Sequence, residues 1–319
     1  VAGAISTATH GTGLRLGNLA TQVAGFTLVT ASGEVIRCSP EDNQPIFSCG
    51  RVGLGALGII STVTLQCVPA FTLAALNRPG RLDAVLEQLD DHVASNDHFE
   101  FFWFPHTDGV YTKANNRTDD PPRPRGRTKA YVDDILLENR VFGLICRLGR
   151  RRTSWIPRLN GVVMRLASPS RRVDASYRIF ASPRLVRFAE MEYGIPRSDA
   201  ADALRALRSF IDSSGLRVNF PVEVRFVAAD DIPLSPSSGR DTCYIAVHTY
   251  HRMPYEDYFR GVERVMDGFG GRPHWGKLHF QSAGTLRPRY PRWDDFAGVR
   301  STLDPKGRFR NSYLDRVLG

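Results

Sequence analysis

Residues 221–226 alternate apolar and polar side chains, the pattern of a β-strand with one buried face. The apolar residues share one face, and Glu223 and Arg225 share the other, because side chains two positions apart in a strand point the same way. An acid and a base held side by side against an apolar reverse face favour a pocket wall, although such a pair is more often a structural ion pair. His274 and Lys277 follow about fifty residues later and lie three positions apart. If the two segments meet, four polar groups converge on one spot.

The spacing of apolar residues predicts the other elements. Helical spacing predicts amphipathic helices over residues 82–93, 155–166, 199–211 and 255–269, and a short helix within the tail, 293–318. We expect Ser198 to cap the third of these helices. Strand patterns occur at 61–68, 99–105 and 243–249, with a hairpin within 25–37 and a strand and turn over 176–188. Residues 115–129 are polar and rich in proline and arginine, which predicts a loop.

Strands alternate with helices after Pro69, which favours an antiparallel sheet with helices on one face and an α+β fold. A chain of 319 residues with 42% hydrophobic residues can bury a sizeable core and is long enough for two domains. No apolar run approaches the roughly 18–20 residues that cross a bilayer.

The 5 cysteines are odd in number, scattered and without a C-x-x-C pair. This usage favours reduced thiols and a cytoplasmic protein over a disulfide framework or a zinc site. His248 and His251 flank a strand end, and the nearest carboxylates in sequence are Glu256 and Asp257. We therefore expect no metal. The chain also lacks the G-x-S-x-G elbow of serine hydrolases.

The net charge of +9 has one main source, because nine arginines and no Asp, Glu or Lys lie between Arg140 and Arg172. A local basic patch attracts anionic surfaces. An apolar stripe flanked by arginines could lie on anionic lipid, giving peripheral membrane contact. The alternative, which we favour, is a helix packed on its own domain with a solvated basic face. Aromatic residues do not interleave with these arginines as stacking platforms, so we expect no nucleic-acid partner.

Two stretches are rich in glycine. Residues 6–13 combine glycine with small hydroxyl side chains, a composition that lets backbone N–H groups approach a phosphate or a flat ring, although a plain glycine turn is the commoner explanation. The second stretch, 49–60, contains G-x-G-x-x-G but precedes a strand instead of following one. It therefore lacks the context of a nicotinamide Rossmann site.

Five segments together give the chain a family resemblance. They are the H-G-T-G loop at residues 10–13, the glycine stretch 53–60, E-M-E-Y at 190–193, the pair E-V-R at 223–225 and H-W-G-K at 274–277, and the tail from Asp304 to Leu314. In this order they resemble the sugar-lactone and alditol oxidoreductases of the vanillyl-alcohol-oxidase-type flavoproteins. That family includes L-gulono-1,4-lactone oxidase or dehydrogenase, D-arabinono-1,4-lactone oxidase and alditol oxidase.

The resemblance implies FAD as cofactor and a two-part fold. Residues 1–69 would be the C-terminal part of a PCMH-type FAD-binding domain, 70–285 a substrate (cap) domain with a large antiparallel sheet flanked by helices, and 286–319 a segment returning to the FAD domain. It implies that the cofactor is held by Ser6, Thr7, His10, Gly11, Thr12, Gly13, Gly58, Ile59, Ile60, His274, Lys277 and Asn311. His10 lies in the later flavin loop, so it is not the histidine that often bonds covalently to FAD in this family.

The resemblance also implies the chemistry. An aldono-1,4-lactone (gulono-, galactono- or arabinono-lactone) would lose a hydride from a secondary alcohol to flavin N5, giving ascorbate-type products, with dioxygen or another carrier taking the electrons. Lys277 would stabilise the anionic reduced flavin and Arg225 would bind the reacting oxygen. Glu223 would orient Arg225 or accept hydrogen bonds from substrate hydroxyls, and His274 would line the flavin edge.

The chain begins Val1-Ala2-Gly3 without an initiator Met and runs at once into the first glycine loop. Because such a loop usually follows earlier strands, we expect an N-terminally truncated or internal piece of a longer protein. Two alternatives to a lactone oxidoreductase stay open: a catalytically silent remnant or binding module, and an alditol oxidase.

Overall fold

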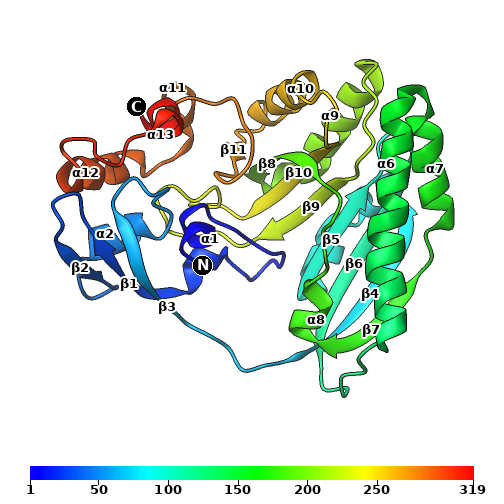
Figure 1. The fold of residues 1–319 in the computed structure, drawn as a ribbon, viewed down its shortest axis with the longest axis horizontal. Coiled ribbons are helices and arrows are strands. Elements are labelled where there is room, and N and C mark those ends of the chain that lie inside the picture. The colour runs from blue at the N-terminus through cyan, green and yellow to red at the C-terminus, as the bar shows by residue number, and fades with distance from the viewer.

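The computed structural model describes residues 1–137 and 139–319 and contains two antiparallel sheets with helices around them (Figure 1). The smaller sheet has three strands in the order β2-β1-β3, and the larger has eight in the order β11-β8-β10-β9-β5-β6-β4-β7. The strands are β1 (Val23–Val29), β2 (Val35–Cys38), β3 (Ile59–Leu65), β4 (Thr72–Arg81), β5 (His98–Trp103), β6 (Gly109–Thr118), β7 (Ser170–Ala175), β8 (Phe188–Pro196), β9 (Val222–Val227), β10 (Thr242–Tyr250) and β11 (Arg272–Pro273).

The α-helices lie between and after these strands. They are α1 (Ala2–Ser6), α2 (Gln44–Gly50), α3 (Leu82–Glu87), α4 (Leu89–Ala94), α5 (Arg127–Ala130), α6 (Phe142–Arg151), α7 (Ile156–Leu166), α8 (Ser176–Phe180), α9 (Ala200–Ser213), α10 (Glu256–Asp267), α11 (Ala283–Leu286), α12 (Trp293–Leu303) and α13 (Ser312–Leu318). A π-helical segment, η2 (Tyr131–Val141), leads into α6. None of the helices in the described residues is long and apolar enough to cross a membrane.

One face of the large sheet is apolar and is covered by α3, α4, α9 and α10. Its strands contribute every second residue to a single core, because alternate side chains of a strand share a face. The fully buried members of this core include Phe101, Trp103, Met191, Tyr193, Ile195, Val224, Phe226, Ile245, Leu204, Leu207, Phe259 and Met266. This apolar layer fixes the register of the sheet, since a slip by one residue would expose it.

The opposite face of the sheet is polar along β8, β10, β9 and β5, and α7 packs against β6. A Cβ added to Gly109 would meet the Met164 side chain at 2.6 Å, and the Tyr111 hydroxyl donates to the Ser168 carbonyl at 3.2 Å. The prediction of helices on one face was therefore incomplete, because α6 and α7 stand on the other side (Figure 1). The antiparallel sheet itself is confirmed.

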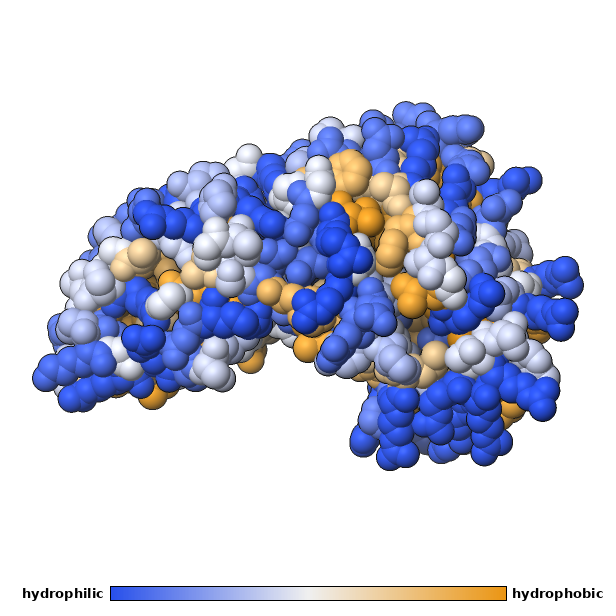
Figure 2. All heavy atoms as spheres, turned by 90° about the horizontal axis from the view of Figure 1, so that it is seen from above, coloured by the Kyte–Doolittle hydropathy of each residue, from blue (hydrophilic) through white to orange (hydrophobic). Residues whose placement is uncertain are grey.

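A second core joins both ends of the chain. It packs α1 and the small sheet against the C-terminal helices, and also takes in Ile232, Leu234 and Trp275 from the middle of the chain. Residues 66–71 connect β3, which packs in this second core, to β4 of the large sheet (Figure 1). Seen from above, the molecule has a mostly hydrophilic surface that is hollowed between its two ends (Figure 2).

Several predicted elements differ in detail. The helix expected over 82–93 is interrupted at Gln88, whose backbone leaves the helical region (φ −111°, ψ 21°). The loop expected over 115–129 begins later, because β6 pairs with β4 as far as Thr118. Residues 176–180 form α8 instead of a strand. Ser198 is not a cap, because a 3-10 turn (Arg197–Asp199) precedes α9 and the Ser198 hydroxyl bonds to Asp199.

Candidate active site

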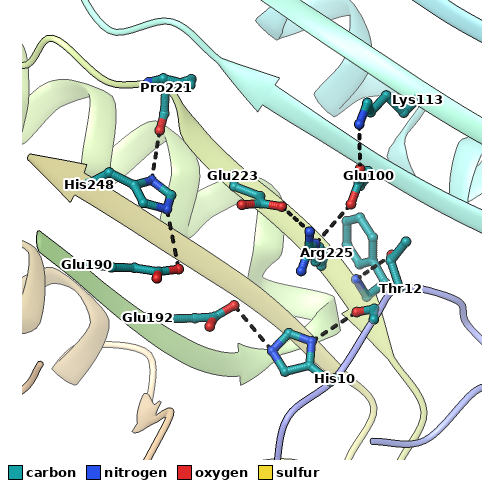
Figure 3. A network of polar contacts seen from close by, with 12 residues as sticks. His10, Thr12, Glu100, Lys113, Glu190, Glu192, Pro221, Glu223, Arg225 and His248 are labelled. Atoms are coloured by element: carbon teal, nitrogen blue, oxygen red, sulfur yellow. Dashed lines mark hydrogen bonds and ion pairs between the residues drawn. The ribbon is translucent and has the colours of Figure 1, made fainter. Parts of the chain in front are cut away.

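Glu223 and Arg225 lie on β9, on the polar face of the large sheet, as the alternation predicted (Figure 3). The Arg225 guanidinium pairs with Glu223 through Nη2, and its Nε donates to Glu100 Oε2 at 2.9 Å. The Lys113 ammonium lies 3.3 Å from the other oxygen of Glu100. Two cations and two carboxylates therefore alternate across three neighbouring strands.

Burial and charge push the two carboxyl groups in opposite directions. Burial raises the pKa of Glu223. The attraction of Arg225 opposes this increase, and the nearby Glu100 carboxylate adds to it. Burial acts in the same sense on Glu100, but Lys113 and Arg225 outweigh it and lower its pKa. The pKa of Arg225 is raised, because its carboxylate partners outweigh the cost of burial. The site therefore contains a firmly charged arginine, an anionic Glu100 and a Glu223 that holds a proton more readily than usual.

A second set of charges lies on β8 and β10. Glu190 of β8 pairs with the Lys277 ammonium. Its carboxylate also lies 3.3 Å from His248 Nε2 (Figure 3). His248 Nδ1 donates to the Pro221 carbonyl at 3.2 Å. Burial raises the pKa of Glu190, but His248 and Lys277 outweigh it, so the net pKa is lowered. Glu190 thus holds Lys277 against the sheet.

The segment 274–277 reaches this position by running along β8. β11 pairs with β8, and the next backbone contact is His274 N–H to the Glu192 carbonyl at 2.9 Å. Trp275 is buried and its Nε1 donates to the Leu234 carbonyl at 2.6 Å, which anchors the segment. Burial lowers the pKa of His274 to about 4, although Glu192 opposes the shift, so its imidazole is neutral at pH 7.

The loop at residues 9–13 is attached to the same face of the sheet. The His10 ring stacks on Tyr244 with 3.6 Å between centroids, and its Nε2 lies 3.2 Å from Glu192 Oε1. The Thr12 hydroxyl donates to the Phe99 carbonyl and accepts from the Phe226 N–H at 3.1 Å. These contacts tie the loop to β8, β10, β9 and β5 at once.

Gly13 continues this attachment, because its N–H donates to the Phe226 carbonyl at 2.7 Å. Its φ of 156° brings the backbone so close to residue 97 that an added Cβ would lie 2.7 Å from the Asp97 carbonyl oxygen. Gly11 is exposed, and nothing lies within 4 Å of the position a Cβ would take there.

One atom from each of His10, Glu192 and His274 lies within 4.8 Å of the others, close enough to share a metal ion. The same ring nitrogens also have partners within the protein. His10 Nδ1 donates to the Gly11 carbonyl at 2.9 Å while Nε2 faces Glu192, and His274 Nδ1 accepts the Gly276 N–H at 3.1 Å. Burial opposes ionisation of Glu192, but the neighbouring histidines and Lys277 outweigh it and hold its pKa far below the usual range. The absence of a metal stays a prediction.

Helix α1 with the adjoining Thr7 faces the second glycine stretch across a mostly apolar hollow of about 390 Å³, which the glycines of residues 6–13 do not line. Its lining includes Ser6, Thr7, Gly58, Ile59 and Ile60. A Cβ at Gly3 or Gly55 would meet nothing within 4 Å, so backbone is exposed to the hollow on both sides. Such a glycine-lined space admits a flat ring or a phosphate against the main chain.

A second hollow, of about 610 Å³, adjoins the charged sheet face. It is lined by Phe188, Ala189, Glu190, Trp275, Gly276, Lys277, Leu278, His279, Tyr313 and Arg316. Asn311, predicted as a cofactor ligand, lines neither hollow; it caps α13 by accepting the Leu314 N–H at 3.0 Å. The C-terminal helix reaches the hollow through Tyr313 and Arg316 instead.

The four polar groups singled out in the sequence thus share one sheet face without forming a single cluster. The strand order β8-β10-β9 puts the Glu190–Lys277 pair and the Glu223–Arg225 pair roughly 10 Å apart, two strand spacings, with His248 between them (Figure 3). Sequence reasoning missed the carboxylates that hold both cations, Glu100 and Glu190. In the sequence, each lies at a polar position of an alternating strand pattern: Glu100 within F-E-F and Glu190 at the start of E-M-E-Y.

Comparison with known proteins agrees with this picture. Residues 63–317 match the family "D-arabinono-1,4-lactone oxidase". The chain is 49% identical over 319 residues to L-gulono-1,4-lactone dehydrogenase of Mycobacterium tuberculosis (100% of this chain, 74% of that protein). It is 36% identical over 329 residues to L-gulonolactone oxidase of Bos taurus (99% and 73%) and 33% identical over 334 residues to alditol oxidase of a Streptomyces species (100% and 73%).

The fold also occurs among solved structures. Cholesterol oxidase from B. sterolicum superposes with a TM-score of 0.81 at 17% identity, covering 99% of this chain and 74% of that one. The predicted α+β architecture with a large antiparallel sheet is confirmed.

Proposed function

Because this chain belongs to the D-arabinono-1,4-lactone oxidase family, we propose that it is an FAD-dependent oxidoreductase that oxidises an aldono-1,4-lactone at a secondary alcohol, towards ascorbate-type products. The observation that carries the proposal is the polar sheet face, where carboxylates hold Arg225 and also hold Lys277 at the edge of the larger hollow. Preorganised cations of this kind stabilise negative charge that develops on an oxygen or a ring.

The residues present fit FAD. The glycine-lined hollow gives a flat group access to the main chain, and Ser6 and Thr7 supply hydroxyl groups at its edge. Gly276, beside Lys277, lies close to the glycine-lined hollow, because a Cβ there would be 3.4 Å from Thr7 Oγ1. This approach brings the segment of Lys277 next to the loop that follows α1. His10, Gly11, Thr12, Gly13, Gly58, Ile59, Ile60, His274 and Lys277 complete the proposed cofactor contacts. When bound, FAD supplies the hydride acceptor at N5.

The protein's own groups bind and polarise the substrate. Arg225 is proposed to donate to the reacting oxygen and to favour its alkoxide. Glu223, whose raised pKa makes it the better proton acceptor of the two carboxylates around Arg225, orients that arginine and accepts hydrogen bonds from substrate hydroxyls. Lys277 holds its positive charge at the edge of the larger hollow, where it would stabilise a neighbouring anion.

Substitution of the two cations tests these roles. In the flavin-loaded protein, Arg225→Ala or Lys277→Ala should lower the rate of flavin reduction by the lactone by at least about a hundredfold, the scale of losing one charge-stabilising donor. Arg289→Ala serves as a control, since this arginine pairs with Asp267 away from both hollows. A loss below about threefold in either test variant would remove that residue from the catalytic set.

The relatives leave two substrate classes, lactones and open-chain alditols. We place aldono-lactones first, because the relatives of higher identity carry lactone names. Dioxygen or another carrier is the proposed electron acceptor. Rates with gulono-, galactono- and arabinono-lactones and with an alditol, each with and without oxygen, separate these cases. An alditol oxidised faster than every lactone would reverse the assignment.

The proposed domain division follows the two cores. Residues 1–69 and 286–319 supply most of the second core, as expected for an FAD-domain part and a returning segment, and 70–285 supply the first. A cytoplasmic location is also proposed, because all 5 cysteines are free thiols.

Peripheral membrane contact is proposed for one further surface, the exposed side chains of residues 140–166, a segment that includes α6 and α7 at the right of Figure 1. Exposed apolar residues lie there among exposed arginines. The apolar members include Val141, Leu144, Trp155, Val162 and Leu166, and the basic members are Arg140, Arg147, Arg151, Arg152, Arg158 and Arg165. Within residues 1–137 and 139–319, no carboxylate forms an ion pair with these arginines. Such a surface complements anionic lipid headgroups.

Vesicle sedimentation tests this contact. Binding to vesicles with anionic lipid should exceed binding to neutral vesicles and fall as salt rises. Arg158→Gln/Arg165→Gln should weaken it by about thirtyfold, since each charge near the surface contributes about 1 kcal/mol. Arg37→Gln/Arg264→Gln removes two exposed charges elsewhere and should leave binding close to normal. Equal binding to neutral and anionic vesicles at low salt would dismiss the contact.

A further inference from the structure

Glu100 lies at the centre of a charged row that crosses three strands of the large sheet. In the strand register, Glu100 is directly opposite Arg225 on β9 and directly opposite Lys113 on β6. Residues paired in this way have Cβ atoms about 5 Å apart and point to the same face. The order Lys113–Glu100–Arg225 is therefore set by the backbone, before any side-chain rotamer is chosen.

Each oxygen of the Glu100 carboxylate takes one of the two cations. Oε2 accepts from Arg225 Nε at 2.9 Å, and Oε1 lies 3.3 Å from Lys113 Nζ (Figure 3). The Lys113 ammonium also lies 5.3 Å from the centre of the Phe102 ring. Glu100 is buried, with 9% of its surface exposed, so an unpaired carboxylate there would be costly. Lys113 supplies the second partner that keeps it charged.

This arrangement determines which part of Arg225 remains available. Nε is occupied by Glu100 and Nη2 by Glu223. Among the described residues, nothing accepts a hydrogen bond from Nη1. The two carboxylates therefore clamp one edge of the planar guanidinium and leave the other for a ligand oxygen. A guanidinium held at one edge only by Glu223 could rotate about its side-chain torsions.

We propose that Glu100, itself anchored by Lys113, is a positioning residue that fixes the Arg225 guanidinium for the substrate oxygen. The proposal rests on the proposed function for its catalytic consequence but not for the geometry of Arg225. Charge supports it. Without Lys113, two carboxylates would share one guanidinium. With Lys113 present, Glu100 has two cationic partners and a lowered pKa, whereas Glu223 has Arg225 as its main cationic partner and a raised pKa.

The first test follows Arg225 directly, by the NMR signal of its Nε–H group, assigned through its absence in Arg225→Lys. In the wild-type protein this proton is hydrogen-bonded and should exchange slowly with water. In Glu100→Ala the signal should broaden or be lost to exchange. In Glu100→Gln, whose amide oxygen can still accept, it should remain. An unchanged signal in Glu100→Ala overturns the proposal whether or not the protein is active.

The second test uses the flavin-loaded protein and L-gulono-1,4-lactone. Glu100→Ala should lower kcat/KM by about a hundredfold and Glu100→Gln by about tenfold, because misplacing a catalytic group by about 1 Å costs on that scale. The matched control is Asp174→Asn. Asp174 is buried on β7 of the same sheet and pairs with Arg172 and Arg178, away from the site. It should lose stability with little loss of kcat.

Three outcomes are decisive. If kcat/KM in Glu100→Ala falls no further than in Asp174→Asn, Glu100 is only structural. If the wild-type protein oxidises no lactone while the Arg225 signal responds to Glu100→Ala, the proposed function fails and the positioning contact stands. Lys113→Met gives an independent check. Without the ammonium, Glu100 should be protonated at a higher pH. On acidification, the Arg225 Nε–H should therefore lose its slow exchange at a higher pH than in the wild-type protein. A pH dependence identical to wild type would contradict the anchoring role of Lys113.

Discussion

Acidification should destabilise this protein well above the pH at which its carboxylates titrate. His279 and His274 are both buried. Burial, reinforced by Arg316, lowers the pKa of His279 from 6.5 to about 3, and burial lowers that of His274 from 6.5 to about 4. Between the folded and unfolded pKa values, these histidines are protonated in the unfolded chain and neutral in the folded chain. Their contribution to stability is complete above pH 6.5 and is lost as the pH falls towards the folded values.

The size of the effect follows from the shifts. Each pKa unit corresponds to about 1.4 kcal/mol, so lowering the pH from about 7.5 to about 4.5 should reduce the free energy of unfolding by roughly 3 kcal/mol per histidine. Glu223 and Asp230 act in the opposite sense, because their pKa values are raised in the folded state. Comparing two variants isolates one histidine from these carboxylates.

Urea unfolding between pH 7.5 and 4.5 measures the effect in wild type, His279→Gln and His251→Gln. Glutamine at 279 can keep a hydrogen bond to the Tyr313 hydroxyl, now 3.0 Å from Nε2, but cannot titrate. His279→Gln should flatten the pH dependence by roughly 3 kcal/mol over this range. His251→Gln removes an exposed histidine instead and controls for the loss of an imidazole. Equal slopes for wild type and His279→Gln would refute the reasoning.

Two further predictions concern the glycine-lined hollow and Lys277. Gly58→Ala should lower the free energy of unfolding by about 1–3 kcal/mol, because a Cβ there would lie 2.6 Å from the Val29 carbonyl. Gly55→Ala, with positive φ but open space, should cost less in the same urea assay; equal losses would refute the steric account. Glu190→Gln should cost about 1–3 kcal/mol at pH 7 by leaving the Lys277 ammonium without its carboxylate. No loss in thermal unfolding would exclude that pair as a stabilising contact.

Local patterns in the sequence predicted much of the fold. Alternation placed Glu223 and Arg225 on one face of β9, and helical spacing gave α7, α9 and α10, because both signals depend on residues a few positions apart. For Glu100, the alternation in F-E-F marks a polar position on its strand but does not identify its partner. Glu100 meets Arg225 only because β5 and β9, more than a hundred residues apart in sequence, become neighbours in the sheet. The carboxylates that hold the two cations are thus a product of topology.

The same reason explains the smaller errors. Nothing local distinguishes residues 115–118 from the loop that follows them, but pairing with β4 extends β6 through them. Asn311 was expected to contact the cofactor; its side chain caps α13, and its contact with the cofactor stays a prediction. Contacts made after folding are thus not visible in the local sequence.

The central claim is that this sheet face and its hollows form the substrate side of a flavin site. The most direct measurement is anaerobic mixing of the flavin-loaded protein with L-gulono-1,4-lactone while the visible absorbance of the flavin is recorded. Rapid bleaching that is slowed at least about a hundredfold by Arg225→Ala is the predicted result. A flavin that is bound but not bleached by any aldono-lactone or alditol would contradict the claim.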